Sequence, residues 1–95
     1  MLTSKDRAAL RKIANSLETI LQVGKGGISE QVVKQADDAL EAREIIKGKV
    51  LENAPAFARE VAEELASATN SEVVQVIGTK FVLYRKNKKN PKITW

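Results

Sequence analysis

The chain has 95 residues and a mass of 10.4 kDa, which is the size of one domain. It contains neither cysteine nor histidine, which excludes disulfides, thiolate chemistry and zinc sites built on those side chains. No segment has the roughly 18–20 apolar residues that span a bilayer, and the first residues lack the apolar core of a signal peptide. We therefore expect a cytoplasmic protein that does not contact membranes.

The charge is unevenly distributed along the chain. The formal net charge is +4, which favours a polyanionic partner, most commonly nucleic acid. Residues 73–95 carry six basic side chains and no acidic one, and residues 1–23 are also basic, whereas residues 24–45 and 54–72 are acidic. If these segments lie on different faces, the molecule is a dipole that docks on a polyanion in one orientation. Alternatively, the charges only solubilise separate helices.

The first half of the chain predicts a helix, a strand and a second helix. The first helix begins after Thr3, which resembles the start of a capping box with Asp6, and apolar residues then recur at helical spacing. A short β-branched segment, Thr19–Val23, is bounded by glycine and predicts a strand. Ser29 has the side chain of an N-cap residue for the second helix.

The next segment predicts a second strand and a third helix. The strand, Ile45–Leu51, contains Gly48, and a glycine weakens the interior of a strand. The helix is expected to begin at Asn53 or the next residue, because Pro55 suits a first helical turn. Its predicted buried stripe starts at Phe57 and continues at helical spacing.

The last two strands predict a hairpin, Val73–Ile77 and Lys80–Arg85, whose two-residue loop has glycine first, as in a type II′ turn. A regular ladder then places Ile77 opposite Lys80, Val76 opposite Phe81, Val74 opposite Leu83 and Glu72 opposite Arg85. One face of this hairpin is a core face, with Val74, Val76, Phe81 and Leu83. The other is a mixed face with Val73, Gln75, Ile77, Lys80, Val82, Tyr84 and Lys86.

Together these elements predict an α/β (α+β) fold with the order α-β-α-β-α-β-β. Residues 1–86 are expected to form one compact domain in which a four-stranded mixed sheet packs with three helices. The sheet is mixed because strands joined through helices favour parallel pairing, whereas the hairpin is antiparallel. Residues 87–95 are polar and basic and are expected to form a flexible tail.

The strongest local feature is Gly24-Lys25-Gly26-Gly27, which lies between a predicted strand and a predicted helix. Glycine lets the backbone approach a ligand, a helix start presents free N–H groups, and Lys25 adds a positive charge, so the combination suits a phosphate. KH domains clamp an RNA backbone with such a G-x-x-G loop. The spacing fits neither a Walker A loop nor the dinucleotide fingerprint. The alternative is a glycine-rich turn that binds nothing.

Several blocks of the sequence resemble the CRM-domain family (chloroplast RNA splicing and ribosome maturation) and its free-standing bacterial members of the YhbY type. They are Leu2-Thr3 with a basic first helix, Leu21–Ile28, Glu44–Lys47, Val76–Gly78 and Val82–Arg85. The resemblance implies an RNA-binding domain similar to the C-terminal domain of bacterial translation initiation factor three, and association with precursors of the large ribosomal subunit. It also implies that residues 24–27 contact RNA. Gly26 and Gly48 depart from the family, which often has asparagine and an apolar residue there.

Further basic side chains are candidates for RNA contact. Arg7 and Arg11 flank the apolar stripe of the first helix, and Lys47 and Lys49 share one face of their strand. Tyr84, on the mixed hairpin face, has a ring that could stack on a base. The alternatives are solvated helix and strand faces, and a half-buried packing role for Tyr84. The complete predicted RNA-binding set is Gly24, Lys25, Gly26, Gly27, Lys5, Arg7, Arg11, Lys12, Lys47, Lys49, Lys80, Tyr84 and Lys86.

From these observations we expect a monomeric RNA-binding protein without cofactor or metal that associates with ribosomal RNA in precursors of the large subunit. We do not expect an enzyme, because the carboxylates lie on helix faces beside basic residues and nothing resembles a paired acid site. One alternative is a protein-interaction module whose acidic helices dock a ribosomal protein or assembly factor. Another is a small factor that binds mature ribosomal subunits, as initiation factors do.

Overall fold

Side-chain caps start the first two helices where the sequence predicts them. The computed structural model describes residues 2–87. α1 (Ser4–Ala14) begins with a complete capping box, in which the Thr3 hydroxyl accepts from the Asp6 N–H and the Asp6 carboxylate accepts from the Thr3 N–H. α2 (Glu30–Arg43) begins after Ser29, whose hydroxyl accepts from the Val32 N–H. Both predicted helix starts are confirmed.

The third helix, α3 (Ala58–Thr69), begins later than predicted. Pro55 lies in the preceding loop, against Gly27, and not in the first helical turn. Phe57 is the N-cap residue and makes no side-chain capping bond. Its predicted burial is wrong, because 81% of its surface is exposed. The remainder of the predicted stripe is buried, at Ala58, Val61 and Leu65.

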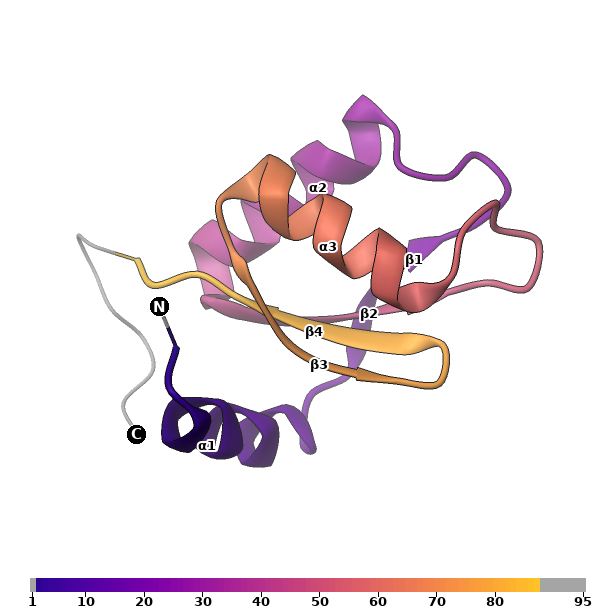
Figure 1. Ribbon diagram of the computed structural model, residues 1–95. Helices are drawn as coiled ribbons and strands as arrows, with labels where there is room; N and C mark the ends of the chain where they lie inside the picture. The colour runs from indigo at the N-terminus through magenta and orange to yellow at the C-terminus, as the bar shows by residue number, and fades with distance from the viewer. Residues whose placement is uncertain (1, 88–95) are drawn as a thin grey trace.

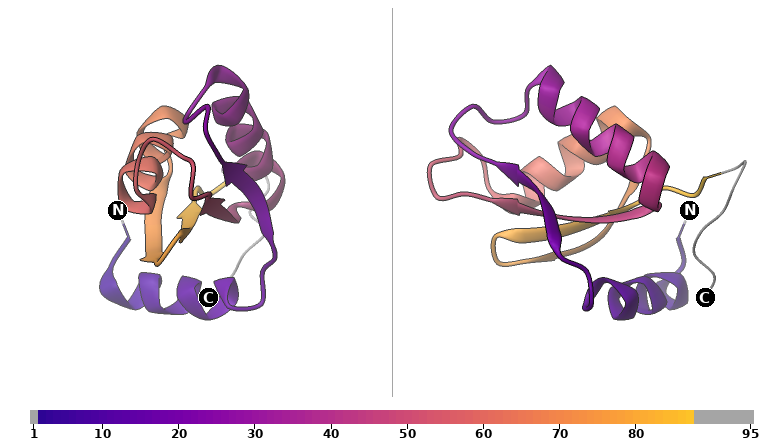
Figure 2. Two further views of the ribbon diagram at one scale, coloured as in Figure 1. Left: turned by 90° about the vertical axis from the view of Figure 1, so that its right-hand side faces the viewer. Right: turned by 180° about the vertical axis from the view of Figure 1, so that it is seen from behind.

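Four strands form one mixed sheet in the order β1-β2-β4-β3: β1 (Thr19–Val23), β2 (Ile45–Val50), β4 (Lys80–Tyr84) and β3 (Glu72–Ile77). β1 and β2 are parallel because α2 connects them, and β4 is antiparallel to both of its neighbours. α2 and α3 cover one face of the sheet and α1 lies on the other, so the domain has three layers (Figures 1 and 2). The predicted element order and sheet type are confirmed.

The hairpin follows the predicted register only near its turn. Gly78 has the positive φ, +58°, that a type II′ turn needs at its first position. Ile77 pairs with Lys80 and Val76 with Phe81, as expected. A β-bulge between Val73 and Gln75 then shifts the ladder, so that Val73 pairs with Leu83 and Glu72 with Tyr84. The predicted pairs of Val74 with Leu83 and of Glu72 with Arg85 are therefore wrong.

The sheet has a hydrophobic core on each face. The larger core lies beneath α2 and α3 and includes Val23, Leu40, Ile46, Leu65, Phe81 and Leu83. The bulge turns Val74 away from that core to the opposite face. There it joins a second core beneath α1, which consists of Leu10, Ala14, Ile45, Val74, Val82 and Tyr84. The predicted mixed hairpin face is therefore partly wrong, since Val82 and Tyr84 are buried on it.

Gly48 is required by packing across the sheet. It pairs with Phe81 on β4, whose ring lies over the glycine. A Cβ atom at Gly48 would lie 2.3 Å from the Phe81 Cζ, and the other contacts of that Cβ would also be with the ring. The expectation that Gly48 merely weakens β2 is therefore wrong, because its missing side chain makes room for Phe81.

The two ends of the sheet differ in construction. At one end, which we call the closed end, β2 begins and β4 finishes, and Arg85 there bonds to α2 and to the end of α3. Its guanidinium lies 2.6 Å from the Asp37 carboxylate and 2.8 Å from the Thr69 carbonyl oxygen. Asn87 donates its backbone N–H to the buried Glu44 carboxylate at 2.6 Å. Asn87, the first residue of the predicted tail, is thus fixed to the domain, and residues 88–95 lie outside the described residues.

At the other end, which we call the open end, β1 and β2 finish and β3 turns into β4. Three loops meet there: residues 24–29, residues 51–57 and the Gly78-Thr79 turn (Figure 1). The two exposed large hydrophobic side chains of residues 2–87, Phe57 and Ile77, both lie at this end. Within the same residues, no helix combines the length and the apolar character that crossing a bilayer requires.

Candidate nucleic-acid interface

The GKGG loop (Gly24, Lys25, Gly26 and Gly27) is a tight turn at the open end. The Gly27 N–H donates to the Gly24 carbonyl oxygen at 2.9 Å, which closes the turn and leaves Lys25 and Gly26 exposed at its tip. Gly27 has φ of +63°, a conformation that favours glycine. The loop therefore holds Lys25 at a defined position on the surface.

The glycines of the GKGG loop have different local roles. A Cβ atom at Gly24 would lie 3.3 Å from the Leu51 side chain, and one at Gly27 would lie 3.1 Å from the Pro55 ring. Both glycines therefore let the loop pack closely against residues 51–57. A Cβ atom at Gly26 would meet nothing within 4 Å, so Gly26 faces open space. Gly26 is thus the position where a ligand or a side chain has most room.

Three predicted lysines lie close together on the sheet face that α1 partly covers. Lys49 on β2 pairs directly with Lys80 on β4, and Lys47 is two positions from Lys49 on the same face. Lys80 is exposed, while Lys47 and Lys49 are half-buried. Like charges directly opposite each other in a sheet destabilise it, so an anion at this surface would relieve their repulsion. We call Lys47, Lys49 and Lys80 the lysine face.

The four basic side chains of α1 are not equivalent. Arg7 is half-buried, and its guanidinium donates to the backbone carbonyl of Val73, beside the bulge in β3. Arg7 therefore fastens α1 to the sheet. Lys5, Arg11 and Lys12 are exposed. Arg11 and Lys12 are in the last turn of α1, whose Ala14 carbonyl oxygen lies 3.4 Å from the Lys47 Nζ, so this helix end adjoins the lysine face.

Tyr84 is not available for stacking on a base. Only 5% of its surface is exposed, because it packs in the core beneath α1. Burial raises the pKa of the Tyr84 phenol above its ordinary value of 10.0, and the charges of Glu44, Asp6 and Glu72 raise it further. The structure therefore corrects the predicted RNA-contacting role of Tyr84 and assigns it to the core.

Lys86 is exposed but lies at the closed end, beyond the last strand and away from the GKGG loop. The structure therefore does not gather the predicted residues into one site. It brings the GKGG loop, Lys49 and Lys80 to the open end, with Lys47 and the last turn of α1 beside them. It leaves Lys86 apart, and it leaves the first turn of α1 near the start of β3, at the closed end.

The helices carry opposite charges on the two faces of the sheet. α1 has four basic side chains and one acidic side chain. α2 has four acidic and two basic side chains, and α3 has three acidic side chains and one basic. Since α1 lies opposite α2 and α3, the predicted separation of charge runs across the sheet (Figure 2). Among residues 2–87, no cluster of three or more acidic side chains is arranged to hold a metal ion.

Comparison with known proteins identifies the family. The model of the CRS1/YhbY (CRM) domain matches residues 2–85. The chain belongs to the CRM family. It is 46% identical over 93 residues to the probable RNA-binding protein YqeI of Bacillus subtilis, and the match covers 98% of this chain and 97% of that protein.

Two further relatives agree with the assignment. A probable RNA-binding protein of Methanocaldococcus jannaschii is 43% identical over 86 residues, which are 88% of this chain and 63% of that protein. The solution structure of a hypothetical protein from Staphylococcus aureus, for which RNA binding has been suggested, has a TM-score of 0.82 and 50% identity. The similarity covers 99% of this chain and 98% of that one.

Sequence reasoning missed Phe57 as a surface feature of this CRM domain. Its helical spacing with Val61 and Leu65 predicted burial, but the helix begins one residue after it. Pro55 could have indicated the error, because a proline is also common in the loop before a helix. Phe57 adds an exposed aromatic ring to the end of the sheet that carries the GKGG loop.

Proposed function

We propose that this CRM domain binds RNA at its open end, through the GKGG loop and the lysine face. The observation that carries the proposal is the sheet order β1-β2-β4-β3, which sets Lys49 against Lys80 next to the strand end that leads into Lys25. The names of the bacterial and archaeal relatives support RNA as the ligand.

Contacts with RNA phosphates are the main interactions in the proposed complex. Lys25 would meet one phosphate, and the exposed tip at Gly26 would let the backbone of the RNA come close to the loop. The lysine face would neutralise further phosphates along the strand, and its own like-charge repulsion would fall as it did so. Such contacts recognise the shape and charge of RNA more than its sequence.

We infer that the RNA is ribosomal, in precursors of the large subunit. This step rests on the resemblance of the GKGG loop and its flanking blocks to the CRM family, which is associated with ribosome maturation. A protein of this size with cations at one end and acidic helices on one face can dock on a particle in a single orientation.

The test is a salt titration of binding to ribosomal RNA fragments. It compares the wild-type chain with Lys25→Glu and with Gly26→Asp, which adds a negative charge where the structure has open space. Arg43→Glu, at the exposed last residue of α2, makes the same charge change as Lys25→Glu on the acidic face and serves as its matched control.

Lys25→Glu and Gly26→Asp should each weaken binding at least about tenfold, and Lys25→Glu should lower the slope of log affinity against log salt by at least about one phosphate equivalent. Arg43→Glu should bind like the wild type. Equal weakening by Lys25→Glu and Arg43→Glu would mean that net charge alone matters. Unchanged binding by both loop variants would remove the GKGG loop from the interface.

The acidic face supports a second candidate, a protein-docking surface. Glu60, Glu63 and Glu64 are all exposed on α3, on the side of the sheet opposite α1. If this surface docks a basic ribosomal protein or assembly factor, reversing these three charges should abolish association with particles, while Lys25→Glu should change it little. Distribution between precursor and mature subunits separates either role from that of an initiation-type factor.

A further inference from the structure

We propose that an unpaired base of the bound RNA stacks on Phe57, in a groove between the start of α3 and the β3–β4 turn. This inference rests on the proposed function, because the GKGG loop would hold the adjoining phosphate. It adds a contact of a different kind, one that depends on an aromatic ring and not on charge.

Phe57 is an unfavourable residue for its position on local grounds. At a helix N-cap, serine, threonine, aspartate and asparagine are preferred because they bond to a free N–H, and Phe57 makes no such bond. Its ring is 81% exposed, so it does not contribute the hydrophobic free energy that burial would give. Residues that oppose local preference often occur at functional sites, so Phe57 is a candidate for a role outside the fold.

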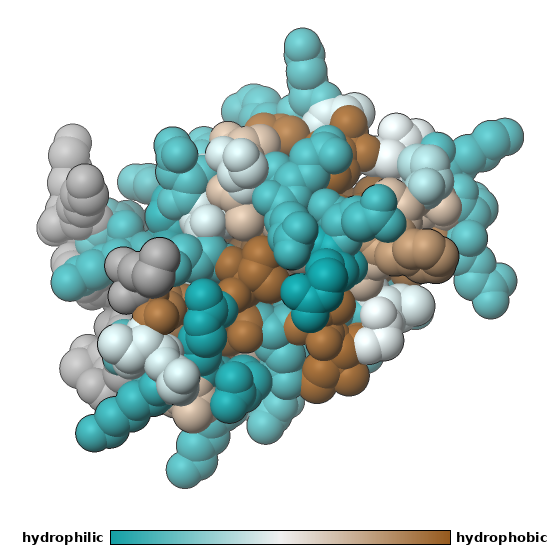
Figure 3. All heavy atoms as spheres, viewed as in Figure 1, coloured by the Kyte–Doolittle hydropathy of each residue, from teal (hydrophilic) through white to brown (hydrophobic). Residues whose placement is uncertain are grey.

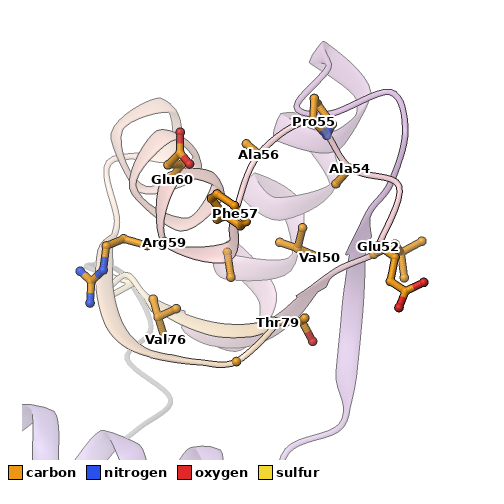
Figure 4. A pocket seen from close by; sticks show the side chains of 13 residues that line it. Val50, Glu52, Ala54, Pro55, Ala56, Phe57, Arg59, Glu60, Val76 and Thr79 are labelled. Carbon is orange, nitrogen blue, oxygen red and sulfur yellow. The ribbon is translucent and has the colours of Figure 1, made fainter.

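The groove beside Phe57 suits a flat, uncharged ring. Its volume of about 480 Å³ is within the range of small-molecule sites. In Figure 4 the charged ends of Glu52, Arg59 and Glu60 point outward from it. Its apolar lining is formed mainly by Val50, Ala54, Pro55, Ala56 and Val76. In the space-filling view, hydrophobic side chains also reach the surface on the side that carries the β3–β4 turn and the start of α3 (Figure 3).

The groove and the GKGG loop are parts of one surface. Pro55, which lines the groove, packs against Gly27 at the end of the GKGG loop, and Gly24 packs against Leu51, another lining residue. Lys25 makes no ion pair with any residue from 2 to 87. A positive charge and an exposed aromatic ring on touching loops match the alternation of phosphate and base along a single strand.

This charge pattern favours RNA over an apolar peptide as the occupant. A peptide in the groove would need no cation beside it, and it would leave Lys25, Lys49 and Lys80 without a role. A base in a duplex has both faces covered by its neighbours, whereas an unpaired base can be splayed out onto an aromatic side chain. The inference therefore predicts a preference for single-stranded or loop RNA.

The experiment uses Phe57→Ser and Phe57→Trp in the full chain. Serine removes the ring but supplies the missing N-cap side chain, so this variant should fold at least as stably as the wild type. Tryptophan keeps an aromatic face. The probe is a short single-stranded RNA that carries the fluorescent adenine analogue 2-aminopurine, together with a paired RNA duplex of the same length, and each is titrated at several salt concentrations.

Phe57→Ser should bind the single strand about 5- to 150-fold more weakly, with an unchanged salt slope, because a stack involves no counterion release. It should also lose the change in 2-aminopurine fluorescence and should bind the duplex like the wild type. Phe57→Trp should retain both affinity and fluorescence change. Single-strand binding by Phe57→Ser that equals the wild type would overturn the inference.

Lys25→Glu separates this inference from the proposed function. If Lys25→Glu weakens binding and Phe57→Ser does not, the GKGG loop binds RNA but no base stacks on Phe57. If RNA binding is unaffected by Phe57→Ser while association with a ribosomal protein is lost, the groove binds protein and the inference is wrong. If the wild-type chain binds neither RNA, both proposals fail.

Discussion

The closed and open ends of the sheet differ in how far their charged and apolar side chains are bonded or buried within the fold. At the closed end, Arg85 bonds to Asp37, Glu41 and the Thr69 carbonyl, so its guanidinium is satisfied within the chain and its side chain is only 20% exposed. At the open end, Lys49 lies against Lys80, and Phe57 and Ile77 are the exposed large hydrophobic residues of the part described. The closed end contributes to stability, and the open end leaves charge and apolar surface for a partner.

This difference suggests that stability and binding can be changed separately. Side chains that bond within the fold should change the free energy of unfolding when they are replaced. Exposed charged or apolar side chains should instead change RNA affinity, with little effect on the free energy of unfolding. A change between the two ends should affect both of them, whereas a change at one end should leave the other intact.

Gly48→Val should have the largest effect, since it lies between the two ends and its side chain would occupy the place of the Phe81 ring. Overpacking of this kind should lower the free energy of unfolding by about 3 kcal/mol, measured by urea denaturation. The matched control is Gly26→Ala, which has open space and should stay within about 0.5 kcal/mol of the wild type. Equal stability of the two variants would contradict the packing role of Gly48.

Arg85→Ala should come next and should affect only the closed end. It leaves the Thr69 carbonyl oxygen and the Asp37 carboxylate without a charged partner, which should cost about 2 kcal/mol of unfolding free energy. Arg59→Ala removes only an exposed pair with Glu63 and should cost less than about 0.5 kcal/mol. RNA affinity of Arg85→Ala, measured where the variant is folded, should match the wild type. A large loss of affinity would show that the two ends are coupled.

Lys80→Gln should have a smaller effect and should change stability and binding in opposite directions. Removing the repulsion with Lys49 should raise the unfolding free energy by about 0.3 kcal/mol. The same change should reduce the salt slope of RNA binding by about one phosphate equivalent. A loss of stability together with unchanged binding would mean that the lysine face serves the fold alone.

Tyr84→Phe should have the smallest effect on the pH dependence of stability, confined to high pH. The pKa of the Tyr84 phenol is raised in the folded state by burial and by nearby carboxylates, so the unfolded chain loses this proton first as pH rises. Its contribution to stability is therefore complete below pH 10 and declines above it, as pH rises toward and through the folded pKa. Urea denaturation across that range should show a steeper fall for the wild type than for Tyr84→Phe. Parallel curves would contradict the shift.

The element order and the sheet type could be predicted because each segment carries its own periodicity. The capping side chains of Thr3 and Ser29 fixed two helix starts without help from tertiary structure. The start of α3 could not be predicted in the same way, because Pro55 is placed by its contact with Gly27, a residue far away in sequence. The bulge at Val73 likewise depends on distant partners, since it delivers Val74 to the core beneath α1.

The sequence indicated most residues of the candidate site but not how they are arranged in space. The sequence indicated the GKGG loop and the strand lysines, yet only the crossing of β4 between β2 and β3 brings Lys80 against Lys49. The hairpin pattern placed Tyr84 on a mixed face, because the sequence around Tyr84 does not show that α1 covers that face. The sequence also indicated Arg7 as one more surface cation, whereas its guanidinium fastens α1 to Val73.

The open space over Gly26 makes this loop a convenient chemical handle. The chain has no cysteine, so Gly26→Cys would introduce a single thiol at an exposed turn tip without a packing clash. A photoactivatable cross-linker attached to that sulfur would sit beside whatever touches the loop. Sequencing the cross-linked RNA would then map the ligand directly, nucleotide by nucleotide, whichever RNA it is.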